Sequence, residues 1–182
     1  MYDKNYVDDC INKTAKLILM HSNIIKLDYD DPFMKIDFIE KLIKLIDYEI
    51  IYLDCDLLYT GYNKSGISDY HKNVIILQPT TESIIDCIKY IALQITKKKC
   101  LVIIDSLNNF SNLFCVDPGI RITTSIMLFA SLAKISESNV LFSSKIESED
   151  INSFVLSVVG TYVIKPEKLF NVTLKSEFKK TQ

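Results

Sequence analysis

Short apolar runs alternate along this chain with longer segments in which apolar residues recur every three or four positions. The short runs predict buried β-strands and the longer segments predict amphipathic helices. Ile36, Ile39, Ile43 and Ile46, for example, fall on one face of a helix that begins at Pro32. In order, the predicted elements are helix 4–20, strand 24–27, helix 32–47, strand 49–54, a polar loop 58–72, strand 73–77, helix 79–99, strand 101–105, helix 122–133, strand 139–143 and two final strands, 154–164 and 170–174.

This order predicts an α/β fold, a doubly wound and mostly parallel sheet with helices on both faces. The last two strands, separated by a polar segment with Pro166, predict a C-terminal antiparallel β-hairpin. With 182 residues, 4 Gly and 4 Pro, the chain has no visible linker, and we predict one domain. Its parts are an N-terminal helix (1–22), an α/β core (23–153), the hairpin (154–176) and a tail (177–182).

Composition excludes several classes of protein. A hydrophobic content of 48% with 24% charged residues is typical of a globular chain, and a net charge of −2 gives no general attraction to nucleic acid or anionic lipid. The 5 cysteines form no C-x-x-C pair, which indicates reduced thiols rather than disulfides or a zinc site. No apolar run approaches the ~20 residues of a membrane span, and no signal peptide is visible. We therefore expect a cytoplasmic protein without a membrane segment.

The apolar run Leu101–Ile104 ends on an acid, Asp105. A buried parallel strand of this kind delivers its last side chain to the carboxyl edge of the sheet, where ligands of α/β proteins bind. The carboxylate would either hold Mg²⁺ near a phosphate or cap the next turn. The strand alone does not distinguish these two roles.

Three segments, 51–56, 101–107 and 131–145, resemble the "YIDTE" strand, the Walker B "VIDSL" segment and the "RLA…NVAVVVTNQ" helix and strand of the RecA/RadA/KaiC group of ATPase cores. The likeness covers about residues 23–176 and implies a RecA-like fold. By this resemblance, Asp56 stands at the position of the catalytic Glu and Asp105 at that of the Mg²⁺-linked Asp. Lys145 replaces the Gln that senses the γ-phosphate.

The segment that matches the family's phosphate loop, 29–36, departs from the G-x-x-x-x-G-K-[ST] pattern. Lys35 falls at the lysine position. Both glycine positions hold bulky residues, Tyr29 and Met34, and Ile36 has no hydroxyl for Mg²⁺. The chain therefore resembles a RecA-type paralogue with a degenerate Walker A motif, a pseudo-ATPase.

Charge around this segment also opposes phosphate. Asp28, Asp30 and Asp31 put negative charge where phosphates would lie. The repulsion between two like charges at ~4 Å costs about 1 kcal/mol in water and about 4 kcal/mol near a protein surface. Pro32 removes an amide donor. Without phosphates to bind, Lys35 is predicted to be a solvated helix residue.

The candidate site residues follow from these positions. Asp56 and Asp105 are the catalytic candidates, although we interpret them as inherited strand-end polar residues rather than working catalysts. Lys35 and Ser106 are the nucleotide-binding candidates, and Asp105 is the metal candidate. A further hypothesis is that Asp56, Asp105 and the cluster Asp28–Asp31 together bind a divalent cation through oxygen ligands.

Candidate DNA-binding cations are Lys97, Lys98, Lys99 and Arg121. The loops that bind DNA in active family members carry little positive charge here, and the segment 145–150 is acidic. Because phosphate contacts from Lys and Arg supply most non-specific affinity, we expect direct DNA binding to be weak or absent.

We therefore expect a non-catalytic RecA/RadA-like paralogue that needs no cofactor and acts as an accessory or assembly subunit. Its partners would be RecA-fold subunits or further copies of itself, and the resemblance suggests recombinational DNA repair. Two alternatives remain open: a divergent Mg-dependent ATPase that binds Mg-ATP in a reshaped site, and an Elongator-like structural subunit of a tRNA-modification complex.

Overall fold

Six strands form a single parallel sheet among the residues that the computed structural model describes, which are residue 16 and residues 24–29, 31–68, 71–145 and 169–174. The elements are β1 (Ile24–Tyr29), α2 (Pro32–Lys44), β2 (Ile50–Asp54), α3 (Leu58–Ser65), β3 (Val74–Leu77), α4 (Ile84–Lys97), β4 (Leu101–Asp105), α5 (Leu107–Asn112), α6 (Pro118–Ser136), β5 (Asn139–Lys145) and β6 (Leu169–Leu174).

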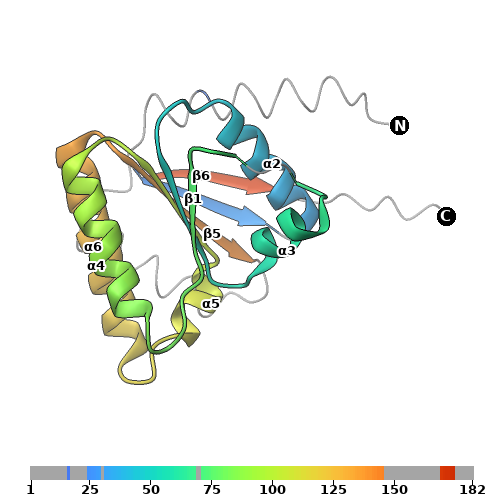
Figure 1. The fold of residues 1–182 in the computed structure, drawn as a ribbon. Coiled ribbons are helices and arrows are strands. Elements are labelled where there is room, and N and C mark those ends of the chain that lie inside the picture. The colour runs from blue at the N-terminus through green and yellow to red at the C-terminus, as the bar shows by residue number, and fades with distance from the viewer. Residues whose placement is uncertain (1–15, 17–23, 30, 69–70, 146–168, 175–182) are drawn as a thin grey trace.

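The strand order is β3-β2-β4-β5-β1-β6, and every neighbouring pair runs parallel. β4 therefore lies between β2 and β5, and its last residue, Asp105, is directly opposite the last residue of β2, Asp54. β1 lies between β5 and β6, so the first and the last strands of the described chain are neighbours (Figure 1).

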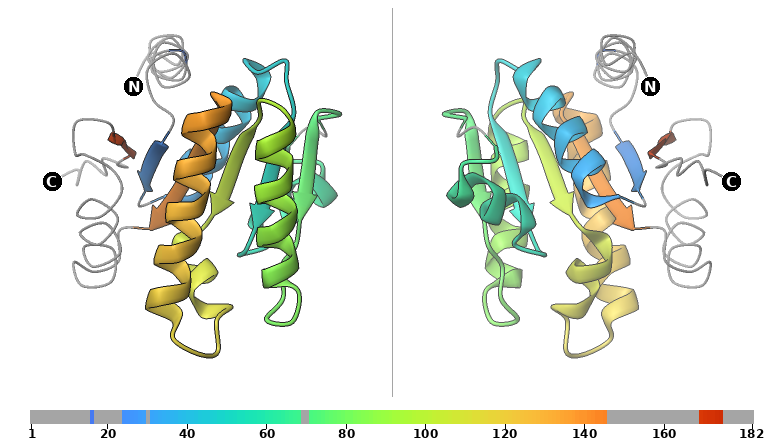
Figure 2. Two further views of the ribbon diagram at one scale, coloured as in Figure 1. Left: turned by 90° about the vertical axis from the view of Figure 1, so that its left-hand side faces the viewer. Right: turned by 90° about the vertical axis from the view of Figure 1, so that its right-hand side faces the viewer.

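Helices cover both faces of the sheet, as Figures 1 and 2 show. α4, α5 and α6 pack on one face, where Ile91, Phe110 and Phe129 join a buried cluster with Val102 and Ile104. α2 and α3 pack on the other face, in a second cluster that includes Phe38, Leu42, Tyr59, Tyr52 and Ile103. Because β2 and β4 contribute alternate residues to the two clusters, these strands are apolar along their whole length up to the terminal aspartates. This is an α/β architecture compatible with a Rossmann-like or RecA-like fold.

α2 begins where its sequence predicts. Asp31 adopts an extended conformation and caps the helix, accepting hydrogen bonds from the amides of Phe33 at 2.7 Å and Met34 at 3.4 Å. Pro32 occupies the first helical turn, where its missing N–H costs nothing. The cap fixes the direction in which α2 leaves β1 and hence the side chains that α2 turns toward the sheet.

The predicted C-terminal antiparallel hairpin is not supported. β6, which was to be its second strand, pairs in parallel with β1. The first strand of the expected hairpin, 154–164, lies outside the described residues, as do all but one residue of the predicted helix 4–20. Antiparallel strands can be joined by a tight turn, which leaves a signal in the sequence, whereas parallel strands are joined by long connections. The apolar pattern of 169–174 therefore does not specify the direction of the strand.

The predicted polar loop 58–72 is corrected in part, because its first half is α3. Tyr59 is buried and stacks on Tyr52, with ring centroids 4.2 Å apart. Gly66 ends the helix with φ +73, a left-handed conformation that glycine adopts without strain. The short α5 was also missed. Among the described helices, none combines the length and apolar character needed to cross a membrane.

Candidate functional site

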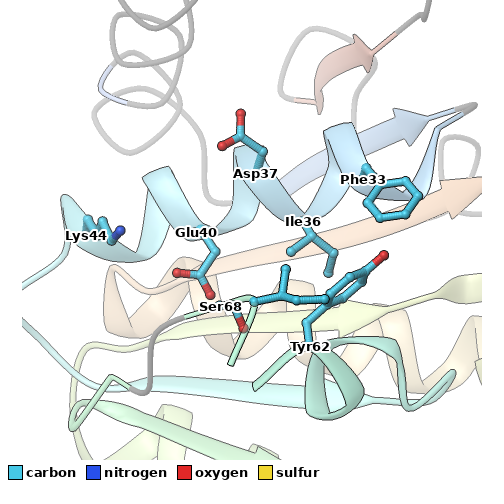
Figure 3. A pocket seen from close by; sticks show the side chains of 8 residues that line it. Phe33, Ile36, Asp37, Glu40, Lys44, Tyr62 and Ser68 are labelled. Atoms are coloured by element: carbon cyan, nitrogen blue, oxygen red, sulfur yellow. The ribbon is translucent and has the colours of Figure 1, made fainter. Parts of the chain in front are cut away.

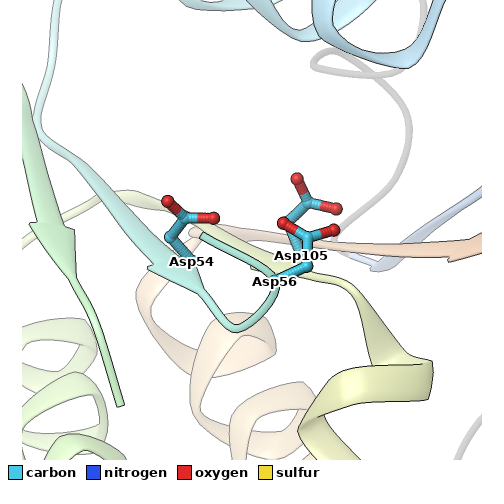
Figure 4. Close-up of side chains that lie close together, drawn as sticks. All are labelled: Asp54, Asp56 and Asp105. Carbon is cyan, nitrogen blue, oxygen red and sulfur yellow. The ribbon is translucent and has the colours of Figure 1, made fainter. Parts of the chain in front are cut away.

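Three carboxylates converge where β2 and β4 end. Asp54 and Asp105 are the paired terminal residues of these strands, and Asp56 follows two positions after Asp54. One oxygen from each of the three side chains lies within 4.8 Å of the others (Figure 4). Asp54 and Asp105 are fully buried, so this is a cluster of negative charge inside the protein rather than a solvated surface.

Lys35 supplies positive charge to this cluster, which overturns the prediction that it is a solvated helix residue. Its side chain is fully buried, and its ammonium lies 2.8 Å from Oδ1 of Asp105 and 3.2 Å from Oδ2 of Asp56. The ammonium also lies 4.8 Å from the centroid of the Tyr29 ring, at cation–π distance. Lys35 precedes Phe38 and Ile39 by three and four positions, so it lies on the apolar face of α2 that packs on the sheet.

The ion pair keeps Lys35 charged. Burial alone would lower the pKa of Lys35, but the negative charges of Asp105 and Asp56 more than offset this effect and the pKa is raised. A buried pair of this kind is costly to break, because removing one partner leaves the other charge without compensation. Lys35 is thus an internal counter-ion of the aspartates.

Both carboxylate oxygens of Asp105 have partners. Besides Lys35, Oδ1 accepts a hydrogen bond from the Ser143 hydroxyl, and Oδ2 accepts one from the Tyr52 hydroxyl at 2.5 Å. Burial and the charge of Asp105 raise the pKa of Tyr52 well above its usual value, so this phenol remains a donor. Asp105 therefore accepts hydrogen bonds on both oxygens, from neighbours on α2, β2 and β5.

Asp54 is the least compensated member of the cluster. Its Oδ2 accepts a hydrogen bond from the amide of Thr60 at 2.8 Å, whereas its buried Oδ1 has no hydrogen-bond partner among the described residues. Burial raises the pKa of Asp54 from 3.8 to about 6, and Asp56 and Asp105 add to the shift. Asp54 is thus partly protonated in mildly acidic solution.

Asp56 closes the cluster on its more accessible side. Its Oδ2 faces Lys35, and its Oδ1 accepts a hydrogen bond from the amide of Leu58 at 3.0 Å. The Asp56 side chain is 15% exposed to solvent. Asp56 therefore accepts from the first amide of α3 and pairs with Lys35 at the same time.

The amides that open α2 are already occupied, which bears on phosphate binding. Those of Phe33 and Met34 donate to the Asp31 side chain, and the amide of Lys35 donates to the Asp31 carbonyl at 3.1 Å. Pro32 has no amide hydrogen. A phosphate at a helix N-terminus binds unpaired amides of this kind. Here the carboxylate of Asp31 already accepts their hydrogen bonds, in the position that a phosphate would occupy.

Of the hypothesised cation site made of Asp56, Asp105 and Asp28–Asp31, the structure brings Asp56 and Asp105 together, whereas Asp28 and Asp31 have other partners. The cluster at the strand ends contains Asp54 instead. Asp28 pairs with Lys26 at 2.7 Å, Asp31 caps α2, and Asp30 lies outside the described residues. The actual set also does not fit an added metal ion as it stands, because Lys35 holds Asp56 and Asp105 and both oxygens of Asp105 are in use.

Ser106, a nucleotide-binding candidate, is buried directly after Asp105, and the peptide bond between the two is cis. Its position as the residue before α5 leaves the hydroxyl close to Tyr29 rather than at an exposed surface. Lys145 ends β5, and its backbone amide donates to the side chain of Asn108 at 3.1 Å.

The structure separates the four DNA-binding candidates. Lys97, Lys98 and Lys99 lie at the end of α4, just before β4 begins, whereas Arg121 lies in the first turn of α6. The end of α4 and the start of α6 lie at opposite ends of this helical layer (Figure 2). Lys98 pairs with Glu49 at 2.9 Å, and the Lys99 ammonium lies 5.2 Å from the Tyr48 ring centroid. These cations do not form one basic surface.

Sequence reasoning missed three members of this network, Tyr52, Asp54 and Ser143. The missed signal for Asp54 was its place at the end of a fully apolar strand, the same pattern that singled out Asp105. Tyr52 and Ser143 carry no such signal, because a tyrosine or serine within a strand has many ordinary uses.

No protein-family model matches the chain, and no curated protein sequence matches it either. The assignment of function therefore depends on the geometry of this site and on the resemblance of the three segments.

Proposed function

We propose that the chain is a non-catalytic α/β domain that acts as an accessory or assembly subunit, with an ion pair in the place where a catalytic relative would bind nucleotide and metal. The observation that supports this most is the buried contact of 2.8 Å between Lys35 and Asp105. The lysine ammonium supplies the charge that a metal ion would supply in a working site, and it does so permanently.

Two further features of the site support the proposal. Asp31 has taken the α2 amides that would bind a phosphate, and Tyr52 and Ser143 donate hydrogen bonds to the two oxygens of Asp105. To bind Mg-nucleotide here, the protein would have to pull Lys35 away from two carboxylates and uncap α2. Breaking a buried pair costs about 3–5 kcal/mol and losing a cap about 0.5–2 kcal/mol. Nucleotide binding would have to exceed both costs.

The cellular context of the proposal follows the resemblance to RecA and RadA. On this resemblance we propose that the protein serves recombinational DNA repair. Its partners would be RecA-fold subunits or other copies of the chain. The absence of a common basic surface among Lys97, Lys98, Lys99 and Arg121 favours contact with protein over direct contact with DNA.

Nucleotide titration tests the non-catalytic part of the proposal. Thermal unfolding of the whole chain is followed with Mg-ATP and Mg-ADP at millimolar concentration. A ligand at 100 times its dissociation constant stabilises a fold by ~2.7 kcal/mol, and we expect no such shift. A shift that Asp105→Asn abolishes would contradict the proposal and favour the divergent ATPase.

Light scattering after size exclusion tests the assembly part. We expect a self-associated species, or a stable complex when a RecA-type protein is added. A chain that stays monomeric and binds no added RecA-type protein would contradict the accessory role while leaving the nucleotide result unaffected.

A further inference from the structure

A pocket of about 240 Å³ opens between α2 and the segment that follows α3, on the helical layer that covers the second face of the sheet (Figure 3). Ile36 and Glu40 come from α2, and Tyr62, Ile67 and Ser68 come from α3 and the turn after it. Pockets for cofactors and drug-sized ligands measure about 300–1,000 Å³. This one is therefore suited to a single side chain rather than to a nucleotide.

A carboxylate oxygen without a partner lies in this pocket. Oε2 of Glu40 pairs with Nε2 of His71 at 2.8 Å, but its buried Oε1 receives no hydrogen bond of ordinary geometry from the described residues. Burial raises the pKa of Tyr59, and the charge of Glu40 and a side-chain hydrogen bond between Tyr59 and Glu40 add to the shift, so the Tyr59 hydroxyl is a second neighbour of this carboxylate. Glu40 as a residue is only 8% exposed, and Figure 3 shows its carboxylate turned toward Ser68, whose buried hydroxyl oxygen also has no partner there.

The pocket also has aromatic walls and an apolar mouth. Phe33 and Tyr62 meet edge to face with ring centroids 5.8 Å apart. Phe33 is 67% exposed and Ile67 is 68% exposed, an unusual exposure for two large apolar side chains that flank one opening. A bound side chain would reach Glu40 past these residues, and the main chain around it would lie on them.

Besides Glu40, the charged residues that line the pocket are Asp37 and Lys44. The carboxylate of Asp37 is bonded to Lys41 at 2.6 Å and points away from the floor of the pocket in Figure 3. Lys44 lies at the end of the lining that is distant from Phe33 and Tyr62. Two buried polar atoms of the lining have no hydrogen-bond partner among the described residues, Oε1 of Glu40 and Oγ of Ser68. The carboxylate oxygen can only accept and the hydroxyl can accept as well as donate, so an occupant with two donors satisfies both.

From these contacts we propose that this pocket binds an arginine side chain of a partner protein. A guanidinium group has several donors in one plane, so it can reach Glu40 and Ser68 together, and its flat face stacks on an aromatic ring. A lysine ammonium is a point charge that lacks the planar face. Arginine in a pocket with an apolar rim is also a common anchor of protein interfaces. This proposal goes beyond the assembly role and is independent of the Lys35 site.

The test is an NMR titration of the whole chain with N-acetyl-arginine amide. We expect saturable shifts of the Tyr62, Ile67 and Ser68 amides with a dissociation constant on the order of 1 mM. The citrulline analogue has the same shape without the charge and should bind at least about tenfold more weakly, or 1.4 kcal/mol. Equal binding of the two compounds, or no saturable shift, would overturn the proposal.

Variants locate the interaction. Glu40→Gln removes the charge, and Phe33→Ala removes an exposed wall without touching the core, so the second variant remains informative if the first is unstable. Each should weaken arginine binding at least about fivefold, or about 1 kcal/mol. Asp86→Asn, the matched change at an exposed carboxylate outside the pocket, should bind as the wild type does. Unchanged affinity in Phe33→Ala would overturn the assignment.

The source of the guanidinium is tested separately. A capped Leu-Arg-Leu peptide should bind more tightly than capped arginine, because Phe33 and Ile67 offer apolar contact beside the pocket. Agmatine, an alkylguanidine without a peptide backbone, should bind more weakly than either. Tighter binding of agmatine would overturn the assignment to a partner protein.

Discussion

The ammonium of Lys35 and the carboxylate of Asp105 are 2.8 Å apart, and neither side chain is exposed to solvent. One residue comes from the first described helix and the other from the central strand β4. The pair therefore fixes α2 against the sheet and neutralises charge at the point where three aspartates meet.

Replacement of Lys35 by Met should destabilise the protein by about 3–5 kcal/mol, because Asp105 and Asp56 would remain buried without a counter-ion. Urea unfolding at pH 7 measures the loss. Lys89→Met is the matched control, since Lys89 also bonds to an aspartate, Asp86, but with both side chains more than two-thirds exposed. The control should lose less than about 1 kcal/mol. Similar losses in the two variants would show that the buried pair contributes little.

Removal of the lysine should also create a cation site. In Lys35→Ala, the oxygens of Asp54, Asp56 and Asp105 would lie near one another around a space that a hard divalent ion prefers. We expect Mg²⁺ or Ca²⁺ to raise the unfolding temperature of this variant and to leave the wild type and Lys89→Ala unchanged. If the ion stabilises all three proteins equally, the ammonium is not acting in place of a metal.

Stability should fall as pH rises from about 4 to 6 because of Asp54. Its pKa is about 6 in the folded protein and 3.8 at its ordinary value, so in this window the folded state binds more protons than the unfolded state. The stabilisation is complete below the lower value and is lost as pH rises through the upper one, to a total of about 3 kcal/mol at 1.36 kcal/mol per pK unit.

Asp54→Asn should flatten this slope and exceed the wild type in stability at pH 7, since an amide cannot ionise. Urea unfolding at several pH values from 4 to 7 measures both effects. Asp86→Asn, at an exposed position, should keep the wild-type slope. An unchanged slope in Asp54→Asn would mean that another group titrates in this range.

The two glycines of the α3 region should respond oppositely to alanine. Gly61 lies inside the helix, and an added Cβ there would meet nothing within 4 Å. Gly61→Ala should therefore stabilise the protein by about 0.5–1 kcal/mol. Gly66 has φ +73, and Gly66→Ala should cost about 1–2 kcal/mol through backbone strain. Chemical unfolding of both variants measures the difference, and effects of the same sign would contradict the assigned ends of α3.

The sequence was sufficient to predict the strands that end at Asp54 and Asp105, because a continuous apolar run with a terminal acid has few other structural uses. It also predicted the start of α2 at Pro32, where cap and periodicity agree. These features depend on residues that are close together in the chain.

Features that depend on distant residues were not predictable in this way. The burial of Lys35 becomes reasonable only when its partners Asp56 and Asp105 are known to lie beneath α2, which requires the strand order. Likewise, Tyr59 of α3 stacks on Tyr52 of β2, a contact that the local polar pattern of 58–65 does not indicate. The periodic pattern places Lys35 in line with Phe38 and Ile39, on the apolar face of α2, even though a lysine is most often a solvated residue.

The place of β1 in the sheet has a consequence for the newly made chain. Its neighbours are β5 and β6, which lie far along the sequence, so β1 and α2 leave the ribosome long before the strands that will hold them are synthesised. Contacts between such distant segments form slowly, and apolar strand edges that wait for them are prone to aggregate. We therefore expect β1 of the growing chain to remain without its sheet neighbours until β5 emerges.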